Sequence, residues 1–207
     1  MQKNQHLKLF DFLMSHQKKR NPLKGRKVRS STIPNRVSIH DRPADIEKTS
    51  EVGHFEGDLT FFKGNQSKNL GVLIDKASRF MLVTQNESKK STEVMKNMFN
   101  ALAQLPDSMR KSITFDNGVE FTLHGLVVNF LKMKTYFCDK SSPWQKGSVE
   151  KQNAFLHWWL PKKMNINTLS ENRLLEVQNQ INNRPRKILG YKTPAQVFYA
   201  QVPFLRE

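Results

Sequence analysis

The sequence predicts an α/β domain in which a mixed five-stranded sheet is flanked by helices. Three observations predict this fold class. Three apolar-rich segments typical of strands come first, with short turns between them. Segments with apolar residues at helical spacing then alternate with two further strands. The chain has 207 residues, which is enough for one domain with a real core and additional segments.

The first three strands are expected at residues 54–62, 69–75 and 80–85. The links between them are short: Lys63, Gly64 and Asn65 form the first, and residues 76–78 belong to the second. Links of this length favour an antiparallel meander.

A helix is expected next, because apolar residues recur at helical spacing from Val94 to Leu105. Ser91 resembles its N-cap, and Pro106 ends it. The remaining elements are a strand at 112–116, a helix at 120–133, a strand at 135–138, helices at 148–160 and 169–183, and a last helix that Thr193 caps and Pro194 begins. This order is that of ribonuclease H-like folds.

The chain divides into three segments by composition. Residues 1–50 form a basic N-terminal arm or linker, expected to be partly disordered, with seven basic residues and no acid from Lys18 to Arg29. Such an arm is either a solvated linker or a DNA-contacting segment, and the two readings are compatible. Residues 51–161 form the predicted RNase H-like core, and residues 162–207 form a C-terminal helical extension.

The charge of the chain indicates a polyanionic partner. The formal net charge is +16, and the isoelectric point is near 10.1. This charge alone suits DNA, RNA and an anionic membrane about equally. No stretch approaches the ~18 apolar residues of a membrane span. No membrane partner is expected.

The chain has a single cysteine, Cys138. This count excludes a disulfide within the chain and a zinc site of four cysteines. Cys138 lies in an apolar run and is expected to be a small buried side chain, in keeping with a reducing cytoplasm.

Three acidic residues stand in unlike settings. Asp58 follows Gly57 within an apolar-flanked strand, Asp116 lies where a strand meets a turn, and Glu150 lies near the start of a helix. Carboxylates from two strand ends and a later helix can converge at one edge of a sheet. Oxygen ligands suit Mg²⁺ or Mn²⁺, and two such ions can act on a phosphodiester. In so basic a chain, the expected phosphodiester is nucleic acid.

The chain resembles bacterial DDE transposases of the insertion-sequence thirty family, whose catalytic cores are similar to retroviral integrase. The match runs from about Ile33 to Phe198. It is carried, in order, by the sequences IPNRVSI (33–39), HFEGD (54–58), FDNG (115–118), SPWQKG (142–147), Glu150, NNRPR (182–186) and GYKTPA (190–195).

This resemblance implies a transposase catalytic domain that performs metal-dependent cleavage and strand transfer of transposon DNA. It implies Asp58, Asp116 and Glu150 as catalytic metal ligands for Mg²⁺ or Mn²⁺, with two ions expected. Residues 51–161 would be the integrase-type catalytic core. The implied partners are transposon ends, target DNA and further copies of the chain, in a cytoplasmic, nucleoid-associated protein. The family's N-terminal helix-turn-helix region is expected to be missing.

The chain departs from the family pattern close to Glu150. Val149 and Lys151 replace the usual flanking asparagines, and His157 replaces a lysine or arginine. These departures motivate an alternative, an inactive truncated remnant that only binds DNA; a structure-specific nuclease of the same fold is a second alternative. His157 either contacts phosphate or packs within the protein. The predicted DNA contacts are Lys18, Lys19, Arg20, Arg26, Lys27, Arg29, Lys146, Lys151, His157, Arg184 and Arg186.

Overall fold

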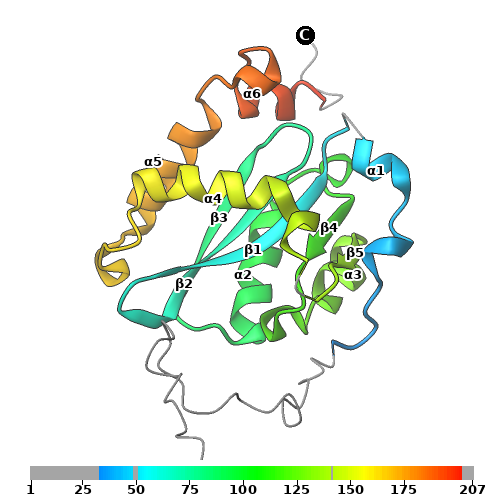
Figure 1. Ribbon diagram of the computed structural model, residues 1–207, viewed down its shortest axis with the longest axis horizontal. Helices are drawn as coiled ribbons and strands as arrows, with labels where there is room; N and C mark the ends of the chain where they lie inside the picture. Colours follow the sequence, from blue (N-terminus) through cyan, green and yellow to red (C-terminus); the bar gives the residue numbers. More distant parts are fainter. Residues whose placement is uncertain (1–32, 49–50, 141, 202–207) are drawn as a thin grey trace, which may run out of the picture. The chain divides into compact units, whose positions relative to one another are not determined.

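The computed structural model describes residues 33–48, 51–140 and 142–201; for residues 47–48, 65–66, 143 and 147–151 it describes the backbone only. The described residues contain a five-stranded sheet with the strand order β3-β2-β1-β4-β5 (Figure 1). Its strands are β1 (His54–Phe62), β2 (Asn65–Asp75), β3 (Met81–Asn86), β4 (Ser112–Phe115) and β5 (Lys134–Phe137). The first three strands form the predicted antiparallel meander, and β4 and β5 run parallel to β1.

Helices occupy both faces of this sheet. The α-helices are α1 (Ala44–Lys48), α2 (Ser91–Ala103), α3 (Gly125–Leu131), α4 (Gly147–Trp159), α5 (Glu171–Asn182) and α6 (Pro194–Tyr199). Short 3₁₀ helices are η2 (Ile39–Asp41), η3 (Asp107–Met109), η4 (Val119–Phe121), η5 (Pro143–Lys146), η6 (Ile166–Thr168) and η7 (Lys187–Leu189).

Two apolar cores lie on opposite faces of the sheet. On one face, side chains of α2, α3 and α6 pack with apolar residues of β1, β4 and β5. On the other face, α4 and α5 cover β2 and β3, with Leu156 and Val177 fully buried. Figure 1 shows α4 and α5 on the near side of the sheet and α2 and α3 behind it. The alternation of apolar residues along the strands therefore supplies both cores.

The helix predicted at 120–133 is shorter in the structure. Residues 119–121 form η4, and α3 begins only at Gly125. The reason is tertiary: the Phe121 ring is fully buried and stacks on Phe115 at 4.4 Å between ring centroids. A tight 3₁₀ turn brings this ring into the core. Lys132, in the left-handed region, ends α3.

The start of α2 also differs from the prediction. The helix begins at Ser91 itself, with Lys90 as N-cap and no capping bond from a side chain. The Ser91 hydroxyl accepts a hydrogen bond from the backbone N–H of Leu123 instead, at 2.9 Å. The strand β2 begins four residues earlier than predicted, because Asn65 pairs with Phe62 of β1, across a register irregularity between Phe61 and Phe62.

Other local predictions are confirmed. Thr193 and Gln196 form a capping box at the start of α6, with Pro194 in its first turn. Cys138 is buried, and burial raises the pKa of its thiol to about 11. None of the helices in the described part of the chain has the length and apolar character needed to cross a bilayer.

Candidate active site

The strand register brings Asp58 and Asp116 together. Strands β1 and β4 are parallel neighbours, with Glu56 paired to Thr114. Two residues further along each strand stand Asp58 and Asp116, which therefore lie at the same level and on the same face of the sheet. Both carboxylates are partly exposed. Asp116 directly follows β4, whereas Asp58 lies in the middle of the longer strand β1 and not at the strand end that the sequence predicted.

Gly57 is required beside Asp58 for a packing reason. A Cβ atom at this position would lie 2.6 Å from the ring of Phe115, the residue before Asp116. The missing side chain lets the Phe115 ring pack closely over β1. A single glycine thus permits the contact between the two strands that carry the aspartates.

The turn after β4 fixes Asp116. Its carboxylate accepts a hydrogen bond from the backbone N–H of Gly118 at 2.9 Å. The Asn117 side chain donates to the carbonyl of Cys138, and Arg36 donates to both the Asn117 amide and that carbonyl, each at 3.0 Å. This network joins the turn to the end of β5 and holds the Asp116 carboxylate at the end of β4.

Lys146 lies between the two aspartates. Its ammonium donates to the Gly57 carbonyl at 3.1 Å, to Asp58 Oδ1 at 3.2 Å and to Asp116 Oδ2 at 3.4 Å. Only 8% of the residue is exposed. Burial acts to lower the pKa of Lys146, but the facing Asp58 and Asp116 carboxylates outweigh it and raise that pKa above its usual value. The sequence predicted Lys146 as a phosphate contact and did not predict this position.

Helix α4 begins at the same place. Its first residue, Gly147, follows Lys146 directly, and the backbone of Glu150 lies in its first turn. Further along, Asn153 donates from Nδ2 to Asp58 Oδ2 at 3.1 Å. The Asn153 Oδ1 atom is buried and has no hydrogen-bond partner among the side chains and backbone that the structure describes. Sequence reasoning missed Asn153, although its spacing of three residues from Glu150 puts both on one side of a helix.

Glu120 is a further carboxyl group near the pair. Burial raises its pKa, and the negative charges of Asp116 and Asp58 raise it further. Its carboxyl group lies against Gly118, where a Cβ atom would overlap it. Within the described residues, no three carboxylate, histidine or cysteine side chains are close enough together to hold a metal ion. Asp58 and Asp116 therefore form the acidic pair, and the side chain of Glu150 is not among those described.

His157 points toward the sheet. Its Nε2 atom is 2.7 Å from the Thr60 hydroxyl, and its Nδ1 atom is 3.1 Å from the Leu160 carbonyl. The ring also meets Phe62 edge-on. Burial lowers its pKa below the usual value. These contacts are those expected if His157 packs within the protein. A contact between His157 and phosphate stays a prediction.

The two predicted C-terminal arginines differ in exposure. Arg184 is exposed, with its guanidinium 5.1 Å from the ring centre of Trp158. Arg186 is buried over the Phe155 ring at 3.8 Å, and burial together with the charge of Arg184 lowers its pKa. The side chain of Lys151 and the predicted contacts Lys18, Lys19, Arg20, Arg26, Lys27 and Arg29 lie outside the described residues.

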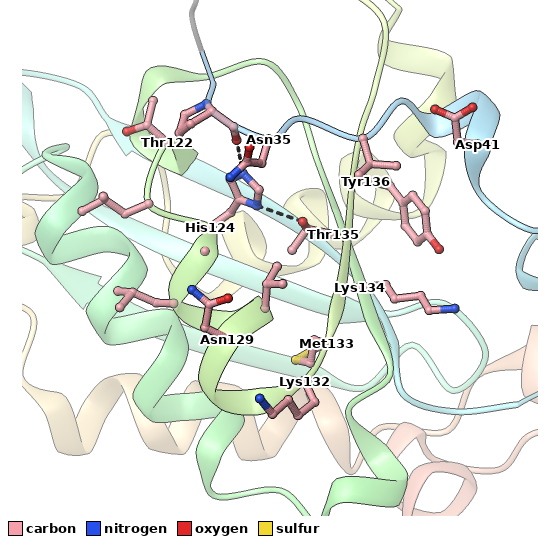
Figure 2. A pocket seen from close by; sticks show the side chains of 16 residues that line it. Asn35, Asp41, Thr122, His124, Asn129, Lys132, Met133, Lys134, Thr135 and Tyr136 are labelled. Carbon is pink, nitrogen blue, oxygen red and sulfur yellow. Dashed lines mark hydrogen bonds between the residues drawn. The ribbon is translucent and has the colours of Figure 1, made fainter.

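A separate cavity of about 740 Å³ lies between α3, β5 and the segment from Pro34 to Asp41. Figure 2 shows His124 among the residues that line it. The His124 ring is hydrogen-bonded to the Thr135 hydroxyl at 2.8 Å and to the Pro34 carbonyl at 2.7 Å. The lining is mainly apolar and does not include the acidic pair. The cavity is therefore distinct from the candidate active site.

Comparison with known proteins shows a similarity to one family, although no family model matches the chain. Over 194 residues, or 93% of its length, the chain is 34% identical to "Transposase InsI for insertion sequence element IS30A" from Escherichia coli (strain K12). It is 36% identical over 174 residues, or 84% of its length, to "Transposase for insertion sequence element IS1086" from Cupriavidus metallidurans. Over most of its length the chain is thus similar to transposases of the IS30 family. It spans about half the length of both relatives, 50% and 51%.

The predicted RNase H-like fold is confirmed by a solved structure. The chain superposes with a TM-score of 0.56 on the catalytic core domain of HTLV-2 integrase, determined in complex with magnesium in a trimeric form. The match covers 72% of this chain and 97% of the integrase core, at 20% sequence identity. This likeness concerns the fold.

Proposed function

We propose that this chain is the catalytic domain of a DNA transposase that cleaves transposon ends and joins them to target DNA with the help of divalent metal ions. The observation that carries the proposal is the acidic pair. Asp58 and Asp116 stand level on adjacent parallel strands and face a single point, and the first turn of α4, with Glu150, begins beside it. The similarity to transposases over most of the chain supports the same conclusion.

The residues present fit a divalent metal. Oxygens of both aspartates lie within hydrogen-bond distance of the same cationic atom, Lys146 Nζ, so they already converge on a positive charge. Asn153 Oδ1, which has no hydrogen-bond partner within the described residues, adds a further oxygen on the adjoining helix. We propose Asp58, Asp116 and Glu150 as ligands of Mg²⁺ or Mn²⁺, with two ions. Such ions supply Lewis-acid stabilisation and an activated oxygen nucleophile for phosphodiester chemistry.

The protein's own contribution is positioning. The close packing of Phe115 on Gly57 and the turn after β4 hold the two aspartates in place. Asn153 orients the Asp58 carboxylate by donating a hydrogen bond to its Oδ2 atom. Exposed Arg184 and the basic arm are proposed to hold the DNA backbone, with Arg186, Lys146, Lys151 and His157 as further candidates. Because the related integrase core occurs in a trimeric form, we propose that the active protein is a homo-oligomer. We place it in the cytoplasm, associated with the nucleoid.

The proposal is tested by DNA nicking and joining. Purified protein is incubated with supercoiled plasmid, and with oligonucleotide duplexes that carry the ends of the encoding element, in Mg²⁺ or Mn²⁺. Asp58→Asn and Asp116→Asn are expected to reduce both reactions to background. Asp107→Asn is the matched control, because Asp107 is an exposed acid paired with Arg110 on η3.

Each outcome separates the alternatives. Cutting without joining would favour a structure-specific nuclease. DNA binding with neither reaction would favour an inactive remnant. Activity retained by both aspartate variants would contradict the proposed site.

A further inference from the structure

We propose that the Lys146 ammonium is a built-in counter-cation of the acidic pair, which a divalent metal ion must displace to bind. The inference rests on the proposed function only in taking Asp58 and Asp116 as metal ligands. It assigns Lys146 a role in setting the metal affinity of the site.

The position of Lys146 Nζ is the first argument. It lies 3.2 Å from Asp58 Oδ1 and 3.4 Å from Asp116 Oδ2. A divalent ion shared by the same two oxygens would lie roughly 2.0–2.6 Å from each. Such an ion and the ammonium would overlap or stand in close like-charge contact. The two cations therefore exclude each other at this point.

The burial of Lys146 is the second argument. Lysine is almost never fully buried unless its charge is paired. Here the side chain is 10% exposed, and within the described residues its hydrogen bonds all go to Gly57, Asp58 and Asp116. The acidic pair thus has a resident positive charge, which limits the repulsion between its two carboxylates.

The surroundings allow the ammonium to leave without unfolding the site. The backbone next to Lys146 is held by Gln145, whose side chain accepts from the Asp139 N–H at 2.7 Å and donates to Asp139 Oδ2 at 2.9 Å. The flexible four-carbon stem of lysine lets Nζ swing away while this clamp stays in place. Asn153 keeps its bond to Asp58 Oδ2, so only Asp58 Oδ1 and Asp116 Oδ2 have to exchange the ammonium for the metal ion.

The test compares Lys146→Met with Lys140→Met in the full chain. Methionine approximates the length of the lysine stem without its charge. Lys140 lies six residues earlier and is exposed, so it matches the change in net charge. Metal is removed with EDTA and the chelator is dialysed away. Mn²⁺ binding is then measured by calorimetry, with Asp58→Asn as the reference for a lost ligand.

We expect Lys146→Met to bind Mn²⁺ at least about tenfold more tightly than the wild type. This factor follows if the site is free of the ammonium less than about a tenth of the time. We also expect a lower unfolding temperature for Lys146→Met in EDTA, because the carboxylates then lose their counter-cation. Lys140→Met is expected to match the wild type in both measurements.

Equal or weaker Mn²⁺ binding by Lys146→Met, with measurable binding by the wild type, would overturn this inference alone. Absence of binding in the wild type and in both lysine variants would overturn the proposed metal site as well.

A measurement on the wild type keeps the inference testable if Lys146→Met fails to fold. The ¹⁵N resonance of the Lys146 ammonium, assigned with Lys146→Gln, should shift on titration with Mg²⁺ at the midpoint found by calorimetry. A resonance that stays unchanged while Mg²⁺ binds would show that the ammonium does not leave.

Discussion

His54 and His157 both titrate below the usual histidine pKa in the folded protein. Burial is the main cause in each case, because it disfavours the charged ring. In the unfolded chain the same rings take up protons near pH ~6.5. The unfolded state therefore binds more protons below this pH. The stability that the neutral rings provide is present above pH ~6.5 and is lost as the pH falls.

We accordingly predict that the free energy of unfolding decreases between pH 7.5 and pH 5.5, and that His157→Gln weakens this decrease. Glutamine can still reach Thr60 but takes up no proton in this range. The measurement is urea unfolding at several pH values for the wild type and the variant. Parallel pH profiles for the two proteins would contradict the assignment.

Some side-chain contacts at the site could not be predicted from the sequence. His157 follows Glu150 by seven residues, or about two helical turns, which puts both on nearly the same helix face. This spacing did not indicate that His157 meets Thr60 on β1. Likewise, a lysine in a turn gave no sign of the contact between Lys146 and Asp58, which are 88 residues apart. Contacts of this kind depend on how elements pack and not on local pattern. The position of Asp116 could be predicted from sequence because a turn directly after a strand leaves a local signal. Asp58 was expected at a strand end but lies in the middle of β1, and its role as a metal ligand stays a prediction.

At the scale of elements, α5 is bonded to the outer strand β3 through side-chain amides. Asn182 accepts from the backbone N–H of Met81 and donates to its carbonyl, both at 2.8 Å. Gln178 accepts from the backbone N–H of Val83 at 2.8 Å. Asn182 and Met81 are buried, so their bonds replace those that a further strand would make.

We predict that Asn182→Ala lowers the free energy of unfolding by about 2–4 kcal/mol, because it leaves a buried N–H and a buried C=O without partners. Gln178→Ala is the matched control and should have a smaller effect, since its bond is only partly buried. Chemical denaturation measures both. A loss at Asn182 no larger than at Gln178 would contradict this account.

Elements were predicted well where one periodicity continues without interruption. The strand β1 and the helices α4 and α5 were placed within two residues of their observed ends. The segment after Asp116 was predicted less well, because the demand for a buried Phe121 breaks a pattern that reads as one helix. Sequence reasoning treated residues 162–207 as an extension, and it could not show that α5 lies over β2 and β3.

At the scale of the whole molecule, this packing predicts that residues 162–207 cannot be removed. Leu174, Val177 and Ile181 cover apolar residues of β2 and β3 in one core. A chain ending at residue 161 would expose this face of the sheet to water. We expect it to be insoluble, or to lose the cooperative unfolding transition seen by circular dichroism. A soluble fragment 1–161 with a sharp transition would show that the extension is a separate unit.

The basic arm predicts a salt-dependent contribution to DNA affinity. Replacing its seven basic residues from Lys18 to Arg29 with glutamine keeps the length and removes the charge. Each lost phosphate contact lowers the log–log salt slope by about 0.9, so the full set can lower it by up to about 6. Fluorescence anisotropy with duplex DNA over a range of salt concentrations measures the slope. An unchanged affinity and slope would contradict a role of the arm in DNA binding.

Both outer strands of the sheet are protected from further pairing. Beside the amides on β3, the backbone N–H of Phe137 on β5 donates to the Val37 carbonyl at 2.9 Å, and Ser38 forms a parallel bridge to the same residue. An open strand edge is a template on which a second chain can add. With these edges engaged, helices and loops are the surfaces left for contacts between copies of the protein. The proposed assembly on DNA would then bring copies to a high local concentration without pairing of their sheets.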